Sequence, residues 1–554
     1  MTVFFCIMYL MNKANIILKS SNIYPGIGNR IFSGFIAIKN DKIIGFDTID
    51  KINNYLDDNT IVMEFKDKLI MPGIHDAHLH LFLSSLYADE KVKLSFDDKS
   101  EQECVEKLKD IEKLNNKDEW MICAGWYHTL WDNPKLPTKY SLDKVYPDRP
   151  VCMISYDLHT GWLNSYGMKK LSIDRNTPDI PGGIIDRDKD GQPLGTFHEA
   201  AFAEVLKKVV AFDEKYINDF YRNFMKKLNS YGITSVCDMS LSPTVGMDFI
   251  RDDIYEKMQS NDELTVRIHM FPTMNIDMSR PLLMKEKYQG PMLFCNGVKQ
   301  FFDGVSSCHT AWLSEPYTNA YFENDCGKPT INPKLMKQLV EKAHINDMSI
   351  RVHTIGDQAI HTMIDFIEDV ENKYGRKSHL QHTLEHLENL QAQDIERLTK
   401  NNILVSVQPA HAVYDMNGVE TDLGKQRIQF MWPFRSELDA GCKLAFGTDS
   451  PVVEINPFYG IYNAITRKNT ITRLPKNGWI EKEKITAFEA ISAYTYGSAC
   501  ACKSENILGT IEINKYADIC VLDRNILEIN PEEIPDTKCL LTMVGGKIVY
   551  QVKN

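Results

Sequence analysis

The most informative stretch of this sequence is Met71-Pro-Gly-Ile-His-Asp-Ala-His-Leu-His80. An apolar run leads into a Pro-Gly bend, and the short segment after the bend ends in His78 and His80. Because alternate residues of a strand share a face, both imidazoles would point the same way from the end of one strand. Two imidazoles placed like this can bind one metal ion. His-X-His alone occurs often by chance, so its meaning depends on the surrounding chain.

The middle of the chain, from residue 72 to about 503, alternates short apolar runs with longer segments of helical period. The runs predicted as strands include Ile233–Cys237, Val298–Phe302, Ile350–Val352, Leu404–Val407 and Leu444–Phe446. The segments predicted as helices include Pro333–Asn346, Gln358–Lys373, Ala392–Asn401 and Thr486–Tyr494. This alternation predicts a parallel α/β fold, most simply one closed (β/α)8 TIM barrel over 72–503. About 86–229 is rich in Pro and aromatic residues, and we interpret it as an insertion after the first barrel strand.

The two terminal regions show short strands and no helical period. Segments 11–71 and 504–554 both contain apolar or alternating runs, with turns at Asn40-Asp41 and Gly545-Gly546. We therefore predict that the termini fold together into one small β-sandwich domain. The first ten residues, MTVFFCIMYL, lack a basic region and a cleavage site. We interpret 1–10 as a start called too early, with Met11 as the true start; a membrane-contacting tail is the alternative.

Composition narrows the class of protein. The chain has 554 residues and a formal net charge of -12, which argues against a large nucleic-acid-binding surface. Its 13 cysteines are scattered and form no Cys-X-X-Cys pair, which indicates reduced thiols in a cytoplasmic protein. We expect no nucleic-acid partner and no membrane partner. Many barrels of this kind are dimers, but no residue here specifies a homodimer interface.

Four further features place chemically useful side chains at the ends of predicted strands. Lys299 lies within the apolar run of Gly297-Val-Lys-Gln-Phe-Phe-Asp-Gly304, where a lysine is costly unless it is paired, neutral or modified. A buried ion pair with Asp303 is the ordinary alternative. His353 ends a β-branched run, and Asp449 follows another in Phe446-Gly-Thr-Asp-Ser-Pro451. His382-Thr-Leu-Glu-His386 offers two histidines, and their spacing alone does not choose between them.

Taken together, the motifs PGxxDxHxH, VKxFxDG, VHxIGD, LEH and GTDSP resemble the amidohydrolase superfamily, most closely its YtcJ-type branch, which includes N-substituted formamide deformylase. The resemblance covers nearly the whole chain. It implies metal ligands at the ends of barrel strands, with the histidine of LEH chosen over His382. The implied ligands are His78, His80, Lys299, His353, His386 and Asp449. Cys308, His309 and Gln381 depart from the branch, which puts the substrate in doubt.

The resemblance also implies that Lys299 is carboxylated on its amine. An ammonium cannot bind a cation, whereas a carbamate is an anionic bridge between two metal ions at roughly 3.5–4 Å separation. Imidazole, carbamate and carboxylate ligands suit two Zn²⁺ per chain, with iron, manganese and nickel as alternatives.

The expected reaction is hydrolysis of a non-peptide C–N bond in an amide, formamide or cyclic amide, by attack of metal-bound hydroxide. Asp449 would carry the proton to the leaving amine. His159 would contact the substrate or its oxyanion, with a structural loop histidine as the alternative, and Asp303 would support Lys299. Trp126 and Trp162, with Trp131, would line an apolar pocket, although core packing explains them equally well.

Two other functions stay open at this point. A mononuclear deaminase acting on a nucleobase-like ring uses nearly the same ligands, but a single metal ion has no need of a bridging lysine. A non-catalytic regulatory protein that kept the fold is the second alternative, and the complete ligand set argues against it. The sequence does not choose among amide-like small-molecule substrates.

Overall fold

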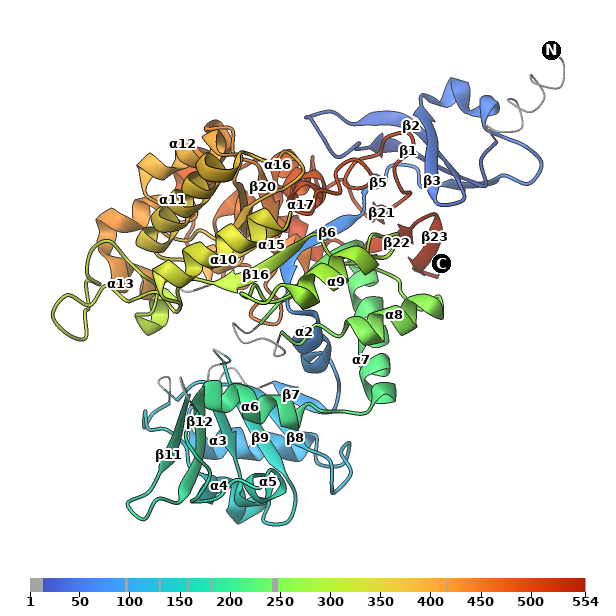
Figure 1. The fold of residues 1–554 in the computed structure, drawn as a ribbon. Helices are drawn as coiled ribbons and strands as arrows, with labels where there is room; N and C mark the ends of the chain where they lie inside the picture. Colours follow the sequence, from blue (N-terminus) through green and yellow to red (C-terminus); the bar gives the residue numbers. More distant parts are fainter. Residues whose placement is uncertain are drawn as a thin grey trace. The chain divides into compact units, whose positions relative to one another are not determined.

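The structure is a computed structural model that describes residues 13–94, 98–128, 131–156, 158, 160–180, 183–241, 248–414 and 416–553. The chain separates into two compact units (Figure 1). The larger unit combines Met1–Leu81 with Met225–Asn554, and the smaller one is Phe82–Phe224. The smaller unit falls within a few residues of the expected insertion at 86–229.

Within the described part of the larger unit, eight strands pair in parallel, each with the next, in a closed circuit. They are β6 (Ile74–Leu79), β13 (Ile233–Met239), β14 (Arg267–Phe271), β16 (Gly297–Phe301), β17 (Ser349–Thr354), β18 (Thr383–His386), β19 (Leu404–Val407) and β20 (Leu444–Phe446). Ladders join most neighbours. Two single bridges, Thr273 with Lys299 and Leu79 with Ser450, complete the circuit. All carboxyl ends of these strands therefore meet at one edge.

The circuit strands are buried along almost their whole length, and polar residues interrupt their apolar ones. Polar exceptions such as His78 and Lys299 are buried as well, so each needs a partner. Short β15 (Leu293–Phe294) extends the pairing of β14. The structure thus shows the α/β class predicted from the sequence.

Helices alternate with the circuit strands along the chain or follow the last of them. Two of them start where the sequence signals a cap: Asn332 accepts a hydrogen bond from the backbone N–H of Lys334, and Asn456 from that of Phe458, each just before a proline. The helices are α8 (Asp252–Ser260), α9 (Ser279–Lys287), α10 (Pro333–Ile345), α11 (Asp357–Tyr374), α12 (Ala392–Lys400), α13 (Met416–Arg427), α14 (Phe434–Asp439), α15 (Pro457–Thr466), α16 (Ala487–Ser492) and α17 (Ser498–Ala501). None of the helices in the described ranges combines the length and hydropathy of a membrane span.

Both ends of the chain contribute to one sheet, in the order β23-β22-β21-β5-β1-β2-β3, with β4 paired to β1. Its strands are β1 (Ile16–Ile23), β2 (Phe32–Lys39), β3 (Lys42–Asp47), β4 (Ile61–Glu64), β5 (Leu69–Pro72), β21 (Ile519–Leu522), β22 (Cys539–Val544) and β23 (Lys547–Gln551). Buried aliphatic side chains from both ends pack in one cluster. The sheet belongs to the same compact unit as the circuit, so its status as a separate sandwich domain stays a prediction.

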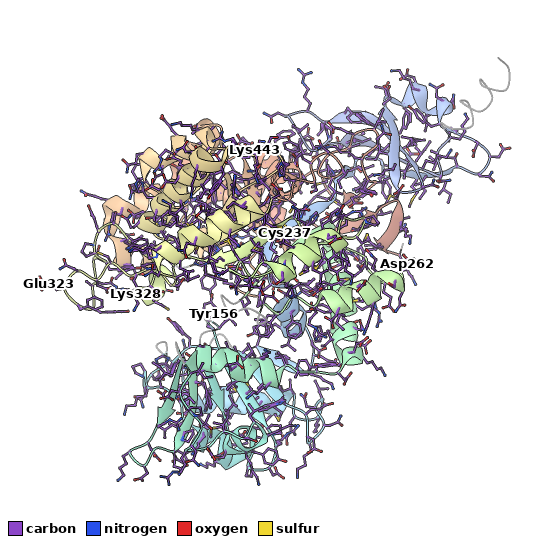
Figure 2. The ribbon with its side chains drawn as sticks, viewed as in Figure 1. Tyr156, Cys237, Asp262, Glu323, Lys328 and Lys443 are labelled. Carbon is purple, nitrogen blue, oxygen red and sulfur yellow. The ribbon has the colours of Figure 1, made fainter. Side chains whose placement is uncertain are left out.

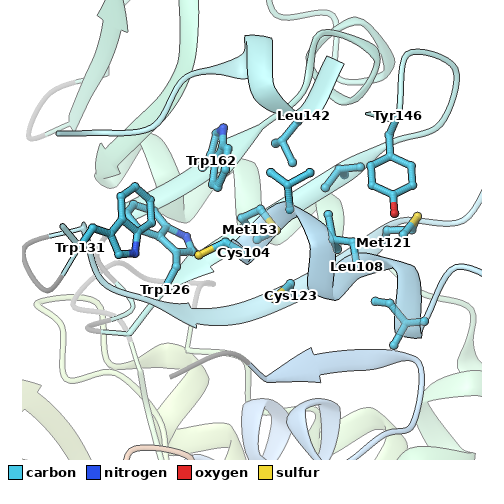
Figure 3. Close-up of a cluster of buried hydrophobic side chains, with 13 residues drawn as sticks. Cys104, Leu108, Met121, Cys123, Trp126, Trp131, Leu142, Tyr146, Met153 and Trp162 are labelled. Atoms are coloured by element: carbon cyan, nitrogen blue, oxygen red, sulfur yellow. The ribbon is translucent and has the colours of Figure 1, made fainter. Parts of the chain in front are cut away.

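The smaller unit has its own sheet, in the order β11-β12-β10-β9-β8-β7. The strands are β7 (Val92–Leu94), β8 (Met121–Trp126), β9 (Val151–Ser155), β10 (Thr160–Leu163), β11 (Gly183–Arg187) and β12 (Pro193–Glu199). The helices that lie wholly or partly in it are α2 (Leu81–Tyr87), α3 (Glu101–Lys107), α4 (Lys139–Val145), α5 (Ser165–Lys170), α6 (Ala200–Val209) and α7 (Glu214–Ser230). Figure 3 shows the apolar cluster on which α3, α4 and the strands pack.

Candidate metal centre

The end of β6 and the loop after β20 form the centre of the site. His78 Nε2 lies 3.4 Å and His80 Nε2 lies 3.2 Å from the same carboxylate oxygen, Oδ1 of Asp449. The backbone holds this arrangement, because the Asp449 N–H donates to the His78 carbonyl and the His80 N–H to that of Ser450. A side chain at Gly447 would lie 2.5 Å from the backbone nitrogen of His78. Glycine at 447 therefore allows the two strand ends to meet.

Three of the predicted histidine ligands are held by their outer ring nitrogens. The Nδ1–H of His78 donates to Glu385 at 2.7 Å, that of His80 to the Met239 carbonyl at 2.9 Å, and that of His386 to the Gln408 side chain at 2.7 Å. Each bond selects the tautomer whose Nε2 keeps a free lone pair. Such partners are the usual support of metal-binding histidines.

The structure separates the two histidines of the fourth motif. The ring of His386 lies 5.0 Å from that of His78 and 4.4 Å from that of His353, between ring centroids. His382 instead accepts a hydrogen bond from the Ile350 N–H at 3.3 Å and lies 3.4 Å from His344. His386 therefore belongs to the cluster, and His382 is a buried structural residue.

Lys299 is fully buried, and its Nζ has no hydrogen-bond partner among the described residues. Its Nζ lies 4.5 Å from the centre of the Phe301 ring. Burial, aided by the charge of Arg351, lowers the pKa of Lys299 to about 8, although Glu385 and Asp449 oppose this shift. A buried amine without a partner is less costly when it is neutral or modified, so these surroundings favour those forms of Lys299.

Asp303 does not have the role predicted for it. Its carboxylate accepts hydrogen bonds from the backbone N–H groups of Trp312, Ile355 and Gly356, and none of the contacts in the described ranges joins it to Lys299. It lies 4.0 Å from His353 Nε2. Asp303 therefore orders the loop that follows β17, and His353 Nε2 contacts the Gly304 carbonyl at 3.3 Å instead.

The surroundings of the site favour neutral rings at His78 and His353 and an ionised carboxylate at Asp449. Burial, followed by the charge of Lys299, lowers the pKa of His78 to about 4 and that of His353 to about 3. Burial alone would raise the pKa of Asp449, but His78, His80 and His386 hold it well below its usual range. Neutral imidazole and ionised carboxylate are the forms that bind metal ions.

Sequence reasoning missed His411, which follows β19. Its Nε2 lies 4.0 Å from Asp449 Oδ2, and its Nδ1 lies 3.8 Å from Glu388. Burial opposes protonation of His411, yet Glu388 and Asp449 raise its pKa. The available signal was weak, since His411 stands four residues beyond the apolar run 404–407 and begins a short 3-10 helix.

Other predicted residues lie elsewhere. His159 is outside the described residues. Trp126 and Trp162 are buried with Trp131 in the core of the smaller unit, which matches the core-packing alternative (Figure 3). His309 stacks between Tyr317 and Tyr321 and donates from Nδ1 to Asp325 at 2.8 Å.

The donor set fits a divalent metal ion. His78, His386 and Asp449 each offer a ligand atom, and these atoms lie within 4.8 Å of one another. Four buried polar atoms here have no hydrogen-bond partner in the described structure: His78 Nε2, Lys299 Nζ, Asp449 Oδ1 and His411 Nε2. Unpaired buried polar atoms are costly, and several that converge on one point indicate a ligand.

Comparison with known proteins establishes the family. The model of the amidohydrolase family matches residues 62–550, so the chain belongs to the amidohydrolase family. It is 29% identical to the putative amidohydrolase YtcJ of Bacillus subtilis, over 87% of this chain and 89% of that one. It is 25% identical to the N-substituted formamide deformylase of Arthrobacter pascens, over 88% and 90%. These matches confirm the YtcJ-type branch.

A solved structure shares the fold. An uncharacterized metal-dependent hydrolase from Pyrococcus horikoshii superposes with a TM-score of 0.75 at 20% identity, over 93% of this chain and 99% of that one. The family thus includes hydrolases that act on C–N bonds, such as the formamide deformylase.

Proposed function

We propose that this protein is a metal-dependent hydrolase of small amide-like molecules, in which the strand circuit serves as a (β/α)8 barrel and the terminal sheet as its small β domain. The cleaved bond is a non-peptide C–N bond of an amide, formamide or cyclic amide. The observation that carries the proposal is the convergence of His78, His80, His386 and Asp449 around unpaired buried donor atoms. The deformylase relative adds chemical precedent, since its name specifies an N-substituted formamide.

The residues that would hold the metal are His78, His80, His353, His386, Lys299 and Asp449. A divalent ion bound there lowers the pKa of its water toward neutrality and polarises the substrate carbonyl. For this role Lys299 carries a carboxyl group on Nζ: the neutral amine adds to carbon dioxide, a C–N bond forms, and one proton leaves. The unpaired, fully buried Nζ is the feature that supports this modification.

Asp449 moves the proton in this mechanism. Its carboxylate is ionised and lies at the centre of the cluster, so it accepts the proton of the attacking water and delivers it to the leaving amine. His411 faces the other carboxylate oxygen and has an unpaired Nε2. That nitrogen donates a hydrogen bond to the substrate or to the oxygen that gains charge. Glu388, beside Nδ1, favours the protonated form of the ring.

Asp449→Asn tests this role. Loss of the base is expected to lower turnover by about 10²–10⁴-fold, while metal is still bound by the histidines. Asp394→Asn is the matched control, because Asp394 is also buried but pairs with His361 of α11 and Arg397 of α12. An Asp449→Asn protein that keeps both its metal and wild-type turnover would remove Asp449 from the mechanism.

Metal content separates the proposal from its alternatives. Protein purified with bicarbonate and without chelator is expected to hold about two transition-metal ions at this site, as in two-metal hydrolases. One ion, unchanged after metal addition, would favour a mononuclear deaminase. No bound metal after addition of zinc and bicarbonate would favour a regulatory protein without activity. A screen of formamides, N-acyl amino acids and cyclic amides then identifies the substrate class.

A further inference from the structure

A second cluster of metal-binding side chains lies apart from the centre described above. It joins His75 of β6, Cys237 of β13 and Cys502, the residue after α17 (Figure 2 labels Cys237). Cys237 Sγ lies 3.5 Å from His75 Nε2 and 3.0 Å from Cys502 Sγ, and Cys502 Sγ lies 3.9 Å from His75 Nε2. All three side chains are at most 2% exposed. Three chain segments distant in sequence thus bring two thiols and one imidazole to a single point.

This cluster is separate from the metal centre in position and in chemistry. Arg351 and Glu385 stand between the two, since Glu385 accepts from both Arg351 Nε and His78 Nδ1. Burial opposes the charge of Arg351, whereas Glu385, Cys237 and Cys502 raise its pKa. The metal centre offers nitrogen and oxygen donors, whereas the second cluster offers sulfur.

Unpaired polar atoms surround the second cluster. His75 Nδ1, both ring nitrogens of His269 and Arg351 Nη1 are buried without hydrogen-bond partners in the part of the chain that the structure describes. His269 stacks on His75, with ring centroids 5.0 Å apart. Buried thiols alone are ordinary small apolar residues. Buried imidazole nitrogens, by contrast, usually have hydrogen-bond partners. Nitrogens that lack one therefore indicate a polar ligand at this point.

We propose that His75, Cys237 and Cys502 form a second metal site that binds a thiophilic d¹⁰ ion such as Zn²⁺. Thiolate and imidazole donors together favour such ions over the harder ones that carboxylates prefer. On binding, the two S–H bonds break, two metal–sulfur bonds and one metal–nitrogen bond form, and two protons leave. Burial raises the pKa of the Cys237 thiol well above its usual range, so the ion itself must displace this proton. The bound ion ties β6 and β13 of the circuit to the segment that leads into β21.

Cobalt substitution tests this site in the full-length protein. The protein is expressed in minimal medium with Co²⁺, because buried ligands are best loaded during folding, and is purified anaerobically with a reductant. A thiolate bound to Co²⁺ gives a charge-transfer absorption band in the near ultraviolet. Nitrogen and oxygen ligands give no such band. We expect this band in the wild type and its loss in Cys502→Ser, with one fewer ion per chain. Cys295→Ser, at another buried thiol, is the matched control and should keep the band.

X-ray absorption of the wild-type protein gives a result that does not depend on any variant. The zinc-loaded protein should show sulfur neighbours at about 2.3 Å. A wild type that shows neither sulfur neighbours nor the charge-transfer band would overturn the proposal, as would a band that survives in Cys502→Ser. His386→Gln should keep the band while it loses metal from the other centre. The second site and the proposed activity therefore fail or succeed independently.

Discussion

Glu385 is the side chain whose replacement tests the metal centre most directly. Its carboxylate accepts from His78 Nδ1 at 2.7 Å through one oxygen and from Arg351 Nε through the other, and all three side chains are fully buried. Burial alone would raise the pKa of Glu385, but Arg351 and His78 hold it well below the usual range. Glu385→Gln removes this charge and keeps the shape.

Two separate losses are expected from Glu385→Gln. His78 loses its charged acceptor, and removal of such a partner typically weakens metal binding by about 10–100-fold. That range corresponds to about 1.4–2.7 kcal/mol. Arg351 also loses its only carboxylate among the described contacts, and an uncompensated buried charge costs about 3–5 kcal/mol of the free energy of unfolding.

The assay is a competition for metal between the protein and a chromophoric chelator, with denaturant unfolding measured in parallel. Glu437→Gln is the control, because Glu437 is also fully buried but lies beside Glu483 and Arg467. Adding Arg351→Met to Glu385→Gln should restore stability but not metal affinity. A folded Glu385→Gln protein with wild-type metal affinity would refute the reasoning. Full recovery of metal affinity in the double variant would show that the unpaired Arg351, and not the lost bond to His78, had weakened metal binding.

Three other predictions follow from single contacts. His386→Gln should lower the metal content per chain, whereas His382→Gln should not, because only His386 faces Asp449; mass spectrometry measures both. Asp518→Ala should lower the free energy of unfolding by about 3–5 kcal/mol, because it leaves the guanidinium of Arg267 buried and unpaired. Burial raises the pKa of Glu437 to about 8, above its ordinary value of 4.5. Its neutral form thus stabilises the fold below pH 4.5, and this contribution, about 5 kcal/mol at most, is lost as pH rises to about 8. Glu437→Gln should remove this pH dependence from the thermal midpoint.

Each of these predictions has a contrary outcome. Equal metal loss in the two histidine variants would mean that the ligand assignment is wrong. An Asp518→Ala protein as stable as the wild type would show that water reaches Arg267. A thermal midpoint with the same pH dependence in the wild type and in Glu437→Gln would place the pH-sensitive group elsewhere, and Glu483, which is also buried, would be the next residue to test.

Much of the fold and part of the site follow from local pattern. Leu404–Val407 and Leu444–Phe446 were predicted as strands and form β19 and β20 with the same bounds, since a short apolar run is a local signal. The residues at strand ends were also found locally. His78 and His80 share one strand end by the geometry of the strand itself, and Asp449 follows an apolar run that Pro451 ends.

The choice between similar residues was not local. His382 and His386 lie on the same short segment, and only the neighbours supplied by β17 and β19 show which one faces Asp449. Asp303 looked like a partner for Lys299 because the two are close in sequence. In the fold, the backbone amides of residues 312, 355 and 356 occupy its carboxylate instead.

The sequence by itself therefore determined the family, the α/β class and the residue types of the candidate metal centre, because strand periodicity and motif spacing act over a few residues. The tertiary structure alone decided which polar groups are paired. The bond of Glu385 to His78, the approach of His411 to Asp449 and the meeting of Cys237 with Cys502 join residues far apart in the chain. Such pairings depend on closure of the strand circuit, which brings distant segments together and removes the water that would otherwise satisfy these groups.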